Sequence, residues 1–407
     1  MRVPVCLLLL LLAFPTLTSS QGISLGGGVE TRTNVERYAD LALDIRDIRE
    51  FLVINDTDAA LTLYDDGRNS LIRPNVKQSI HGISKLLALK NPSETTPPYI
   101  YHLWGLANRD IKALPDNSLY AHTFVLSAII STPEIAADAM VALNMWMYAA
   151  HLLFQGVDIC QKLSVADNPQ AFDLGGGGVE EFIALWIGQD QIAASEEGHG
   201  LYAMAQKAGA FFGKNTPEAQ VNTNIKLLYQ EGAQALSFPN ACSKQNTDTV
   251  VQLWTITQRI MSQMFIPLMQ LLIDAVLQDD VNGVKLYATA IVPQISQCRP
   301  SLFKRLKESL IDKALVSSKR LNILQDLQAS YDCLGFTCSD IGIYKVDQLA
   351  ECADLPSTLP MAEYTPTSFV HDVSTRYCVK RTNESLATHV SCLILSFLLI
   401  HSAQKLI

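Results

Sequence analysis

The sequence predicts an all-α protein: a multi-helix bundle with a probable internal duplication, followed by a disulfide-rich C-terminal extension. Apolar residues recur at helical spacing along most of the chain, and few segments alternate as strands do. One helix–turn–helix pattern occurs twice. Four cysteines gather within residues 325–382. These observations favour two helical units in series, then a short segment held by disulfides.

The composition fits a large folded protein without a nucleic-acid partner. The 407 residues suffice for one large domain or two ordinary ones, and the aliphatic content supports a substantial core. The formal net charge of −9 provides no basic surface of the kind that binds nucleic acid.

Both ends of the chain carry processing signals. Residues 1–20 have a charged start, an apolar run and small polar residues, as signal peptides do. The apolar tail 390–400 is too short to span a bilayer comfortably. Since a small-residue site at Asn383 precedes it, residues 383–407 indicate GPI attachment, with a short C-terminal anchor as the alternative. We expect a protein on the extracellular face of the plasma membrane, or secreted, with a lipid anchor as its membrane contact.

Cysteine usage agrees with export. Without the two terminal segments seven cysteines remain, from which we expect three disulfides and one leftover thiol. Their spacing does not decide the pairing. They are Cys160, Cys242, Cys298, Cys333, Cys338, Cys352 and Cys378. Asn55 and Asn383 are N-glycosylation acceptors, as the secretory route allows.

The first helical unit covers residues 21–170. Apolar residues at helical spacing predict an amphipathic helix over 35–53, and Asn55–Asp58 break it and cap a second helix. Gly67 is expected to end that second helix. Two more helices are predicted at 119–131 and 133–155.

The second unit covers residues 171–324 and repeats this pattern. LYAMAQKAGAFFG and VNTNIKLLYQEGAQAL correspond to RYADLALDIRDIREFL and DAALTLYDDGRNSL. The matched pairs are Tyr38 with Tyr202, Tyr64 with Tyr229, and Gly67 with Gly232. Further helices are expected at 250–278, with a kink at Pro267, and at 285–297 and 300–315. Residues 325–382 form the predicted Cys-rich extension and stalk.

A polar stripe marks the helix at 133–155. Asn144, Tyr148, His151 and Gln155 follow one another at helical spacing on a single face of an apolar segment. Buried polar groups need partners, so the stripe is either an internal hydrogen-bond network or the wall of a site with His151 as a ligand. His122 on the preceding helix would then be its companion.

Two acidic pairs lie in the central stretch 173–213. Glu180 and Glu181 follow four glycines and open a helix, where acids stabilise the helix dipole. Glu181 could instead join the histidines on a metal ion. Glu196, Glu197 and His199 form a second cluster, framed by glycines, which is either solvated or a further source of ligands.

The metal hypothesis takes His122, His151, Glu181 and His199 as ligands. A mixed oxygen and nitrogen set favours iron, and a helical bundle can hold such an ion between its helices. No HExxH, P-loop or GxSxG motif occurs, so we expect no catalytic residues.

The chain resembles the low-iron-inducible, iron-assimilation protein family associated with the algal periplasm and cell surface. The similarity rests on LYDDGRNSL, LYQEGAQAL, MWMYAAHLLF, and EEFIALWIGQDQ followed by GHGLYAMAQKAG. It implies an extracellular protein that binds iron as its cofactor or cargo and assists its uptake without catalysis. The alternative is a GPI-anchored recognition or adhesion protein that holds no metal and binds a cell-surface protein partner.

Overall fold

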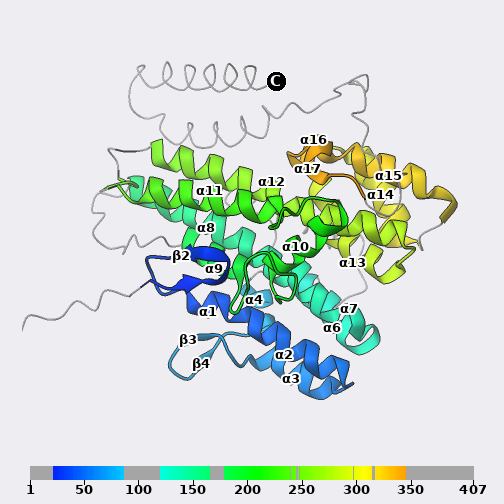
Figure 1. Ribbon diagram of the computed structural model, residues 1–407, viewed down its shortest axis with the longest axis horizontal. Helices are drawn as coiled ribbons and strands as arrows, with labels where there is room; N and C mark the ends of the chain where they lie inside the picture. Colours follow the sequence, from blue (N-terminus) through cyan, green and yellow to red (C-terminus); the bar gives the residue numbers. More distant parts are fainter. Residues whose placement is uncertain are drawn as a thin grey trace, which may run out of the picture. The chain divides into compact units, whose positions relative to one another are not determined.

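Helices make up most of the computed structural model, which describes residues 22–86, 120–165 and 178–344 apart from 239, 244–245, 247, 297 and 314–316. The predicted all-α class is confirmed (Figure 1). The α-helices are α1 (Glu36–Ala39), α2 (Leu41–Val53), α3 (Thr57–Asp66), α4 (Ile80–Leu86), α6 (Tyr120–Ser131), α7 (Pro133–Ala139), α8 (Trp146–Val165), α9 (Val179–Ile187), α10 (Leu201–Phe211), α11 (Gln220–Leu236), α12 (Asp248–Leu277), α13 (Val281–Ile291), α14 (Pro300–Lys307), α15 (Arg320–Gln328), α16 (Tyr331–Leu334) and α17 (Cys338–Ile341).

Shorter elements join these helices. The π-helix η2 (Met140–Met145) connects α7 to α8, and the π-helix η5 (Glu308–Asp312) extends α14. The 3₁₀ turns are η1 (Gly26–Gly28), η4 (Val292–Ile295) and η6 (Ser317–Lys319). Two small antiparallel hairpins complete the set: β1 (Ser24–Leu25) with β2 (Val29–Glu30), and β3 (Leu71–Arg73) with β4 (Val76–Lys77).

The long helix α12 is the core of the bundle. It contacts α8, α10, α11 and α13, and most of its apolar side chains are buried. Among the described helices, only α12 is long and apolar enough to cross a membrane, and 78% of its most apolar stretch is buried inside the protein.

The predicted caps of the N-terminal helices are confirmed. The Asp56 carboxylate accepts a 3.1 Å hydrogen bond from the backbone N–H of Ala59 and starts α3. Gly67, with a φ of 69°, follows α3 and accommodates a left-handed backbone. Buried Asp44 of α2 accepts a 2.9 Å bond from the backbone N–H of Asn69, which fixes the turn after α3 against α2.

The two predicted helical units pack into one body. Helix α1 of the first unit lies on α9 of the second, and α8 of the first lies on α12. The described residues belong to a single compact unit. The correspondence of Gly67 with Gly232 does not hold, because Gly67 ends α3 whereas Gly232 lies inside α11. The described residues therefore show a helical bundle without showing an internal duplication.

Two disulfides are present among the described cysteines. Cys160 of α8 pairs with Cys242, and Cys298 pairs with Cys333 of α16. Cys338 is disulfide-bonded as well. The predicted signal peptide, the stalk after residue 344 and the tail with Asn383 lie outside the described residues.

Candidate functional site

His122 lies in a cluster of rings between α3, α4 and α6. Its Nδ1 is 3.1 Å from the Tyr64 hydroxyl, and its ring stacks on that of His81 with centroids 4.1 Å apart. His81 in turn pairs with Asp65, with 2.8 Å between Nδ1 and the carboxylate. These partners orient His122 within this cluster.

Two residues of the polar stripe take part in buried hydrogen bonds. Asn144 donates to the Ser84 hydroxyl at 2.7 Å, and the Tyr148 hydroxyl accepts a 3.1 Å bond from Gln78. His151 stacks on Tyr148, and burial lowers its pKa, so the imidazole is neutral at neutral pH. Gln155, the fourth residue of the stripe, is exposed.

The two glutamates of α9 hold the N-terminal segment. The Glu180 carboxylate is buried and accepts bonds from the backbone N–H groups of Arg32 and Thr33, at 3.0 and 2.9 Å. Glu181 forms an ion pair with Arg37 at 3.6 Å. Both acids are therefore engaged with residues 32–37 of the same chain.

The four predicted metal ligands do not form one site. In the described part of the chain, no group of three or more His, Cys, Asp or Glu side chains is placed to hold a metal ion. His122, His151 and Glu181 each lie in the separate surroundings given above. His199 lies apart from these three residues and lines the candidate site.

His199 lines an open cleft of about 70 Å³ between the helices. Side chains from α2, α7, α10, α12 and α13 meet there with the loop before α10. The apolar wall consists of Val141, Ala203, Met204 and Leu271. The polar side chains are Arg49, Asp138, Glu196, His199, Lys207 and Tyr287. We call this space the central cleft.

His199 presents an unpaired polar atom. Its Nδ1 is buried and has no hydrogen-bond partner among the described residues. Burial lowers the pKa of His199, and the nearby cations Arg49 and Arg46 lower it further. Glu50 and Asp47 oppose the two arginines with smaller effects. His199 is thus neutral at neutral pH.

Two further groups define the polarity of the central cleft. Arg49 forms an ion pair with Asp138, at 3.0 Å through its Nη2. Burial and the nearby carboxylates, Asp138 first among them, raise the pKa of Tyr287, so its phenol stays protonated and can donate a hydrogen bond.

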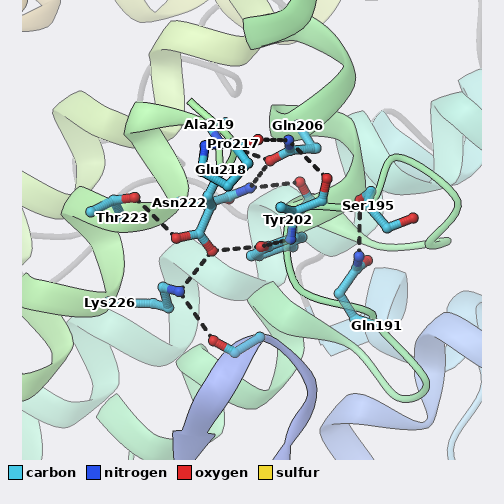
Figure 2. A network of polar contacts seen from close by, with 12 residues as sticks. Gln191, Ser195, Tyr202, Gln206, Pro217, Glu218, Ala219, Asn222, Thr223 and Lys226 are labelled. Atoms are coloured by element: carbon cyan, nitrogen blue, oxygen red, sulfur yellow. Dashed lines mark hydrogen bonds and ion pairs between the residues drawn. The ribbon is translucent and has the colours of Figure 1, made fainter. Parts of the chain in front are cut away.

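A polar network holds the loop that carries His199 (Figure 2). The backbone N–H of Ala194 donates to the Tyr202 hydroxyl at 2.9 Å, and that hydroxyl donates to Glu218 at 2.5 Å. Gln206 donates to the carbonyl of Ala194 at 3.2 Å. Gln191 closes the loop with a 3.0 Å bond to the carbonyl of Ser195. Tyr202 and Gln206 of α10 therefore hold Ala194, in the loop that leads to His199.

The same network reaches the N-terminal hairpin. Glu218 binds Lys226 at 2.7 Å, and Lys226 also donates to the carbonyl of Gly27 at 3.1 Å. Nearby, the Tyr229 hydroxyl donates to the carbonyl of Glu30. Hairpin β1–β2 is thus attached to α11.

Sequence patterns identified only part of the central cleft. His199 and Glu196 stand out because glycines frame them. Arg49, Asp138, Lys207 and Tyr287 carry no signal of their own, because each is one polar residue on an amphipathic helix. Only the packing of separate helices brings them together.

Comparison of the chain with protein-family models, with curated proteins and with solved structures finds no match.

Proposed function

We propose that this chain is a non-catalytic extracellular binding protein that takes a small polar ligand into the central cleft. The observation that carries the proposal is a cleft of about 70 Å³ that His199 lines together with Arg49, Lys207 and Tyr287. A space of this size accepts several waters or one small molecule, since a water needs about 10–15 Å³.

The lining of the central cleft suits the binding of a small ligand. The neutral imidazole of His199 offers a hydrogen-bonding site that is already oriented by the loop. A preformed pocket with a few polar groups on an apolar wall is typical of small-ligand sites.

Iron acquisition remains our prediction for the wider role. The described residues offer no direct ligand set for a metal ion, so the proposed route is through the ligand of an iron complex. Carboxylate complexes of iron present the polar oxygens that this cleft would receive. Elemental analysis of the secreted protein, exposed to ferric citrate and then exchanged into buffer, tests this role separately.

Location and anchoring also remain predictions. Surface recognition without metal is the second function that the sequence allows. The exposed acceptor Asn55, in the turn between α2 and α3, is accessible for the glycan that both functions predict.

Four small probes test the proposed function: acetate, acetamide, methylammonium and inorganic phosphate. Each is titrated into the secreted protein by calorimetry. We expect at least one to bind, and Ala203→Leu to abolish that binding because Ala203 lines the central cleft. Ala210→Leu, on the same helix but outside the cleft, is the matched control and should bind normally. Absence of binding by all four, or binding that survives Ala203→Leu, would overturn the proposal.

A further inference from the structure

We infer that the ligand of the central cleft carries an oxyanion, a carboxylate or phosphate group, held by Arg49, Lys207 and Tyr287 beside His199. This inference rests on the proposed function and specifies its ligand. Some polar groups of the cleft already have partners within the protein, and others remain available to bind a ligand. The inference follows from the available groups.

Arg49 has donors to spare. Its hydrogen bond to Asp138 uses Nη2 only, and a guanidinium has five N–H donors in a planar fork. The remaining donors match the paired oxygens of a carboxylate or phosphate. With 41% of its side chain exposed, Arg49 is reachable from the cleft.

Lys207 supplies the second positive charge. It lines the central cleft from α10, and no described residue forms an ion pair with it. Tyr287 of α13 also lines the cleft and adds a protonated phenol. The three groups come from three different helices, so their convergence is a property of the fold.

Two acids also line the central cleft. Asp138 is bound to Arg49 at 3.0 Å. Glu196 is exposed on the loop and Lys207 is exposed on α10, so water screens both charges. The inference therefore rests on the N–H and O–H donors that the cleft presents, not on its net charge.

Acetate against acetamide is the decisive comparison, because the two have the same shape and only acetate is charged. We expect acetate to bind at least about tenfold more tightly, as charge-assisted hydrogen bonds are the stronger ones. Lys207→Gln should weaken acetate binding by about three- to tenfold. Arg259→Gln is the charge-matched control, because Arg259 pairs with Glu231 on the surface, and it should leave binding unchanged.

Arg49 needs two variants, since Arg49→Gln also frees the charge of Asp138. In Arg49→Gln/Asp138→Asn both charges are gone. If Arg49 donates to the ligand, acetate binding stays weak in the double variant. Recovery of full affinity there would assign the effect to repulsion by Asp138 and remove Arg49 from the site.

The outcomes separate the two proposals. Equal binding of acetate and acetamide, or a preference for methylammonium, with sensitivity to Ala203→Leu, overturns the oxyanion and leaves the proposed function standing. Binding of acetate but not phosphate, or the reverse, identifies which oxyanion the central cleft accepts and supports the inference. Failure of all four probes overturns both.

Discussion

The indole N–H of Trp186 donates a 3.0 Å hydrogen bond to the side-chain oxygen of Asn222, and both side chains are fully buried. This bond joins α9 to α11. Asn222 also donates to the carbonyl of Tyr202 at 3.0 Å, so it connects α9, α10 and α11 at one point. The loop that carries His199 runs between α9 and α10, and its two ends are fixed by this contact.

Asn222→Leu should destabilise the protein by about 1–3 kcal/mol, because it leaves the Trp186 indole N–H buried without a partner and removes the side-chain bond to the Tyr202 carbonyl. Urea unfolding followed by tryptophan fluorescence measures the loss. Thr223→Ala is the control. It removes one exposed hydrogen bond to Glu218 next along the helix and should cost less than about 1 kcal/mol. Equal losses of unfolding free energy in the two variants would show that the buried Asn222 amide has no special role.

Glu180→Ala should release the N-terminal segment while the bundle remains folded. The carboxylate accepts two backbone N–H bonds from residues 32 and 33 and a third bond from the Thr33 hydroxyl. Hydrogen exchange of residues 22–33 should accelerate by about tenfold or more, whereas exchange in α12 should not change. Unchanged protection of residues 22–33 would contradict the assigned role of Glu180.

Asp40→Asn should stabilise the protein at neutral pH. Burial, with smaller effects from Glu36 and Asp44, raises the pKa of Asp40 from 3.8 to about 6. A carboxyl with a raised pKa binds its proton more tightly in the folded state, so stability falls as pH rises through this interval. Because Asp40 is only half-buried, we expect a gain of about 1 kcal/mol at pH 7. No gain should remain below pH 3.8, where the carboxyl is protonated in both states; a gain of equal size at both pH values would contradict the pKa assignment.

Removing the Cys160–Cys242 disulfide should cost about 2–5 kcal/mol, because it closes a long loop of 82 residues in sequence separation. The double variant Cys160→Ser/Cys242→Ser tests this in urea. The shorter loop of Cys298–Cys333, with a separation of 35, should contribute about 1 kcal/mol less. A larger contribution to stability from Cys298–Cys333 than from Cys160–Cys242 would show that packing in the native state outweighs loop closure.

Acetate binding should strengthen as pH falls from about 8 to about 5.5, because protonation of His199 adds positive charge beside the oxyanion. Burial and Arg49 lower the pKa of His199, so the change is expected at the acidic end of this range. His199→Gln should remove the dependence, whereas the same titration of Lys207→Gln should retain it. A flat profile in the unmodified protein would exclude contact between His199 and the ligand.

Much of the helical architecture follows from sequence. The expected helix at 119–131 is α6, the helix at 250–278 is α12, and the capping by Asp56 is as predicted. These features depend on local spacing and on the chemistry of one turn, which a sequence displays directly. The helix expected at 133–155 is interrupted by the π-helix η2 and continues to the end of α8. Apolar periodicity predicts the helix but does not reveal the π-helix within it.

The candidate site depends on contacts that local patterns do not encode. His122 has a partner on another helix, Tyr64 of α3, whereas His151 stacks on Tyr148 of its own helix α8. Arg49 and Tyr287 are far apart in sequence and meet only because α2 and α13 face the same cleft. A histidine on a helix face can belong to a structural cluster or to a binding site, and the sequence pattern is the same in both cases.

The most direct test observes the His199 ring itself. In protein labelled with ¹⁵N-histidine, the two ring nitrogens of His199 are assigned by their loss in His199→Gln and followed while acetate is added. The central cleft as described predicts that the Nδ1 resonance shifts in a saturable way, that the His151 ring does not respond, and that Ala203→Leu abolishes the shift. Ring nitrogens of His199 that ignore acetate and the other three probes would contradict the assignment of a ligand to this cleft.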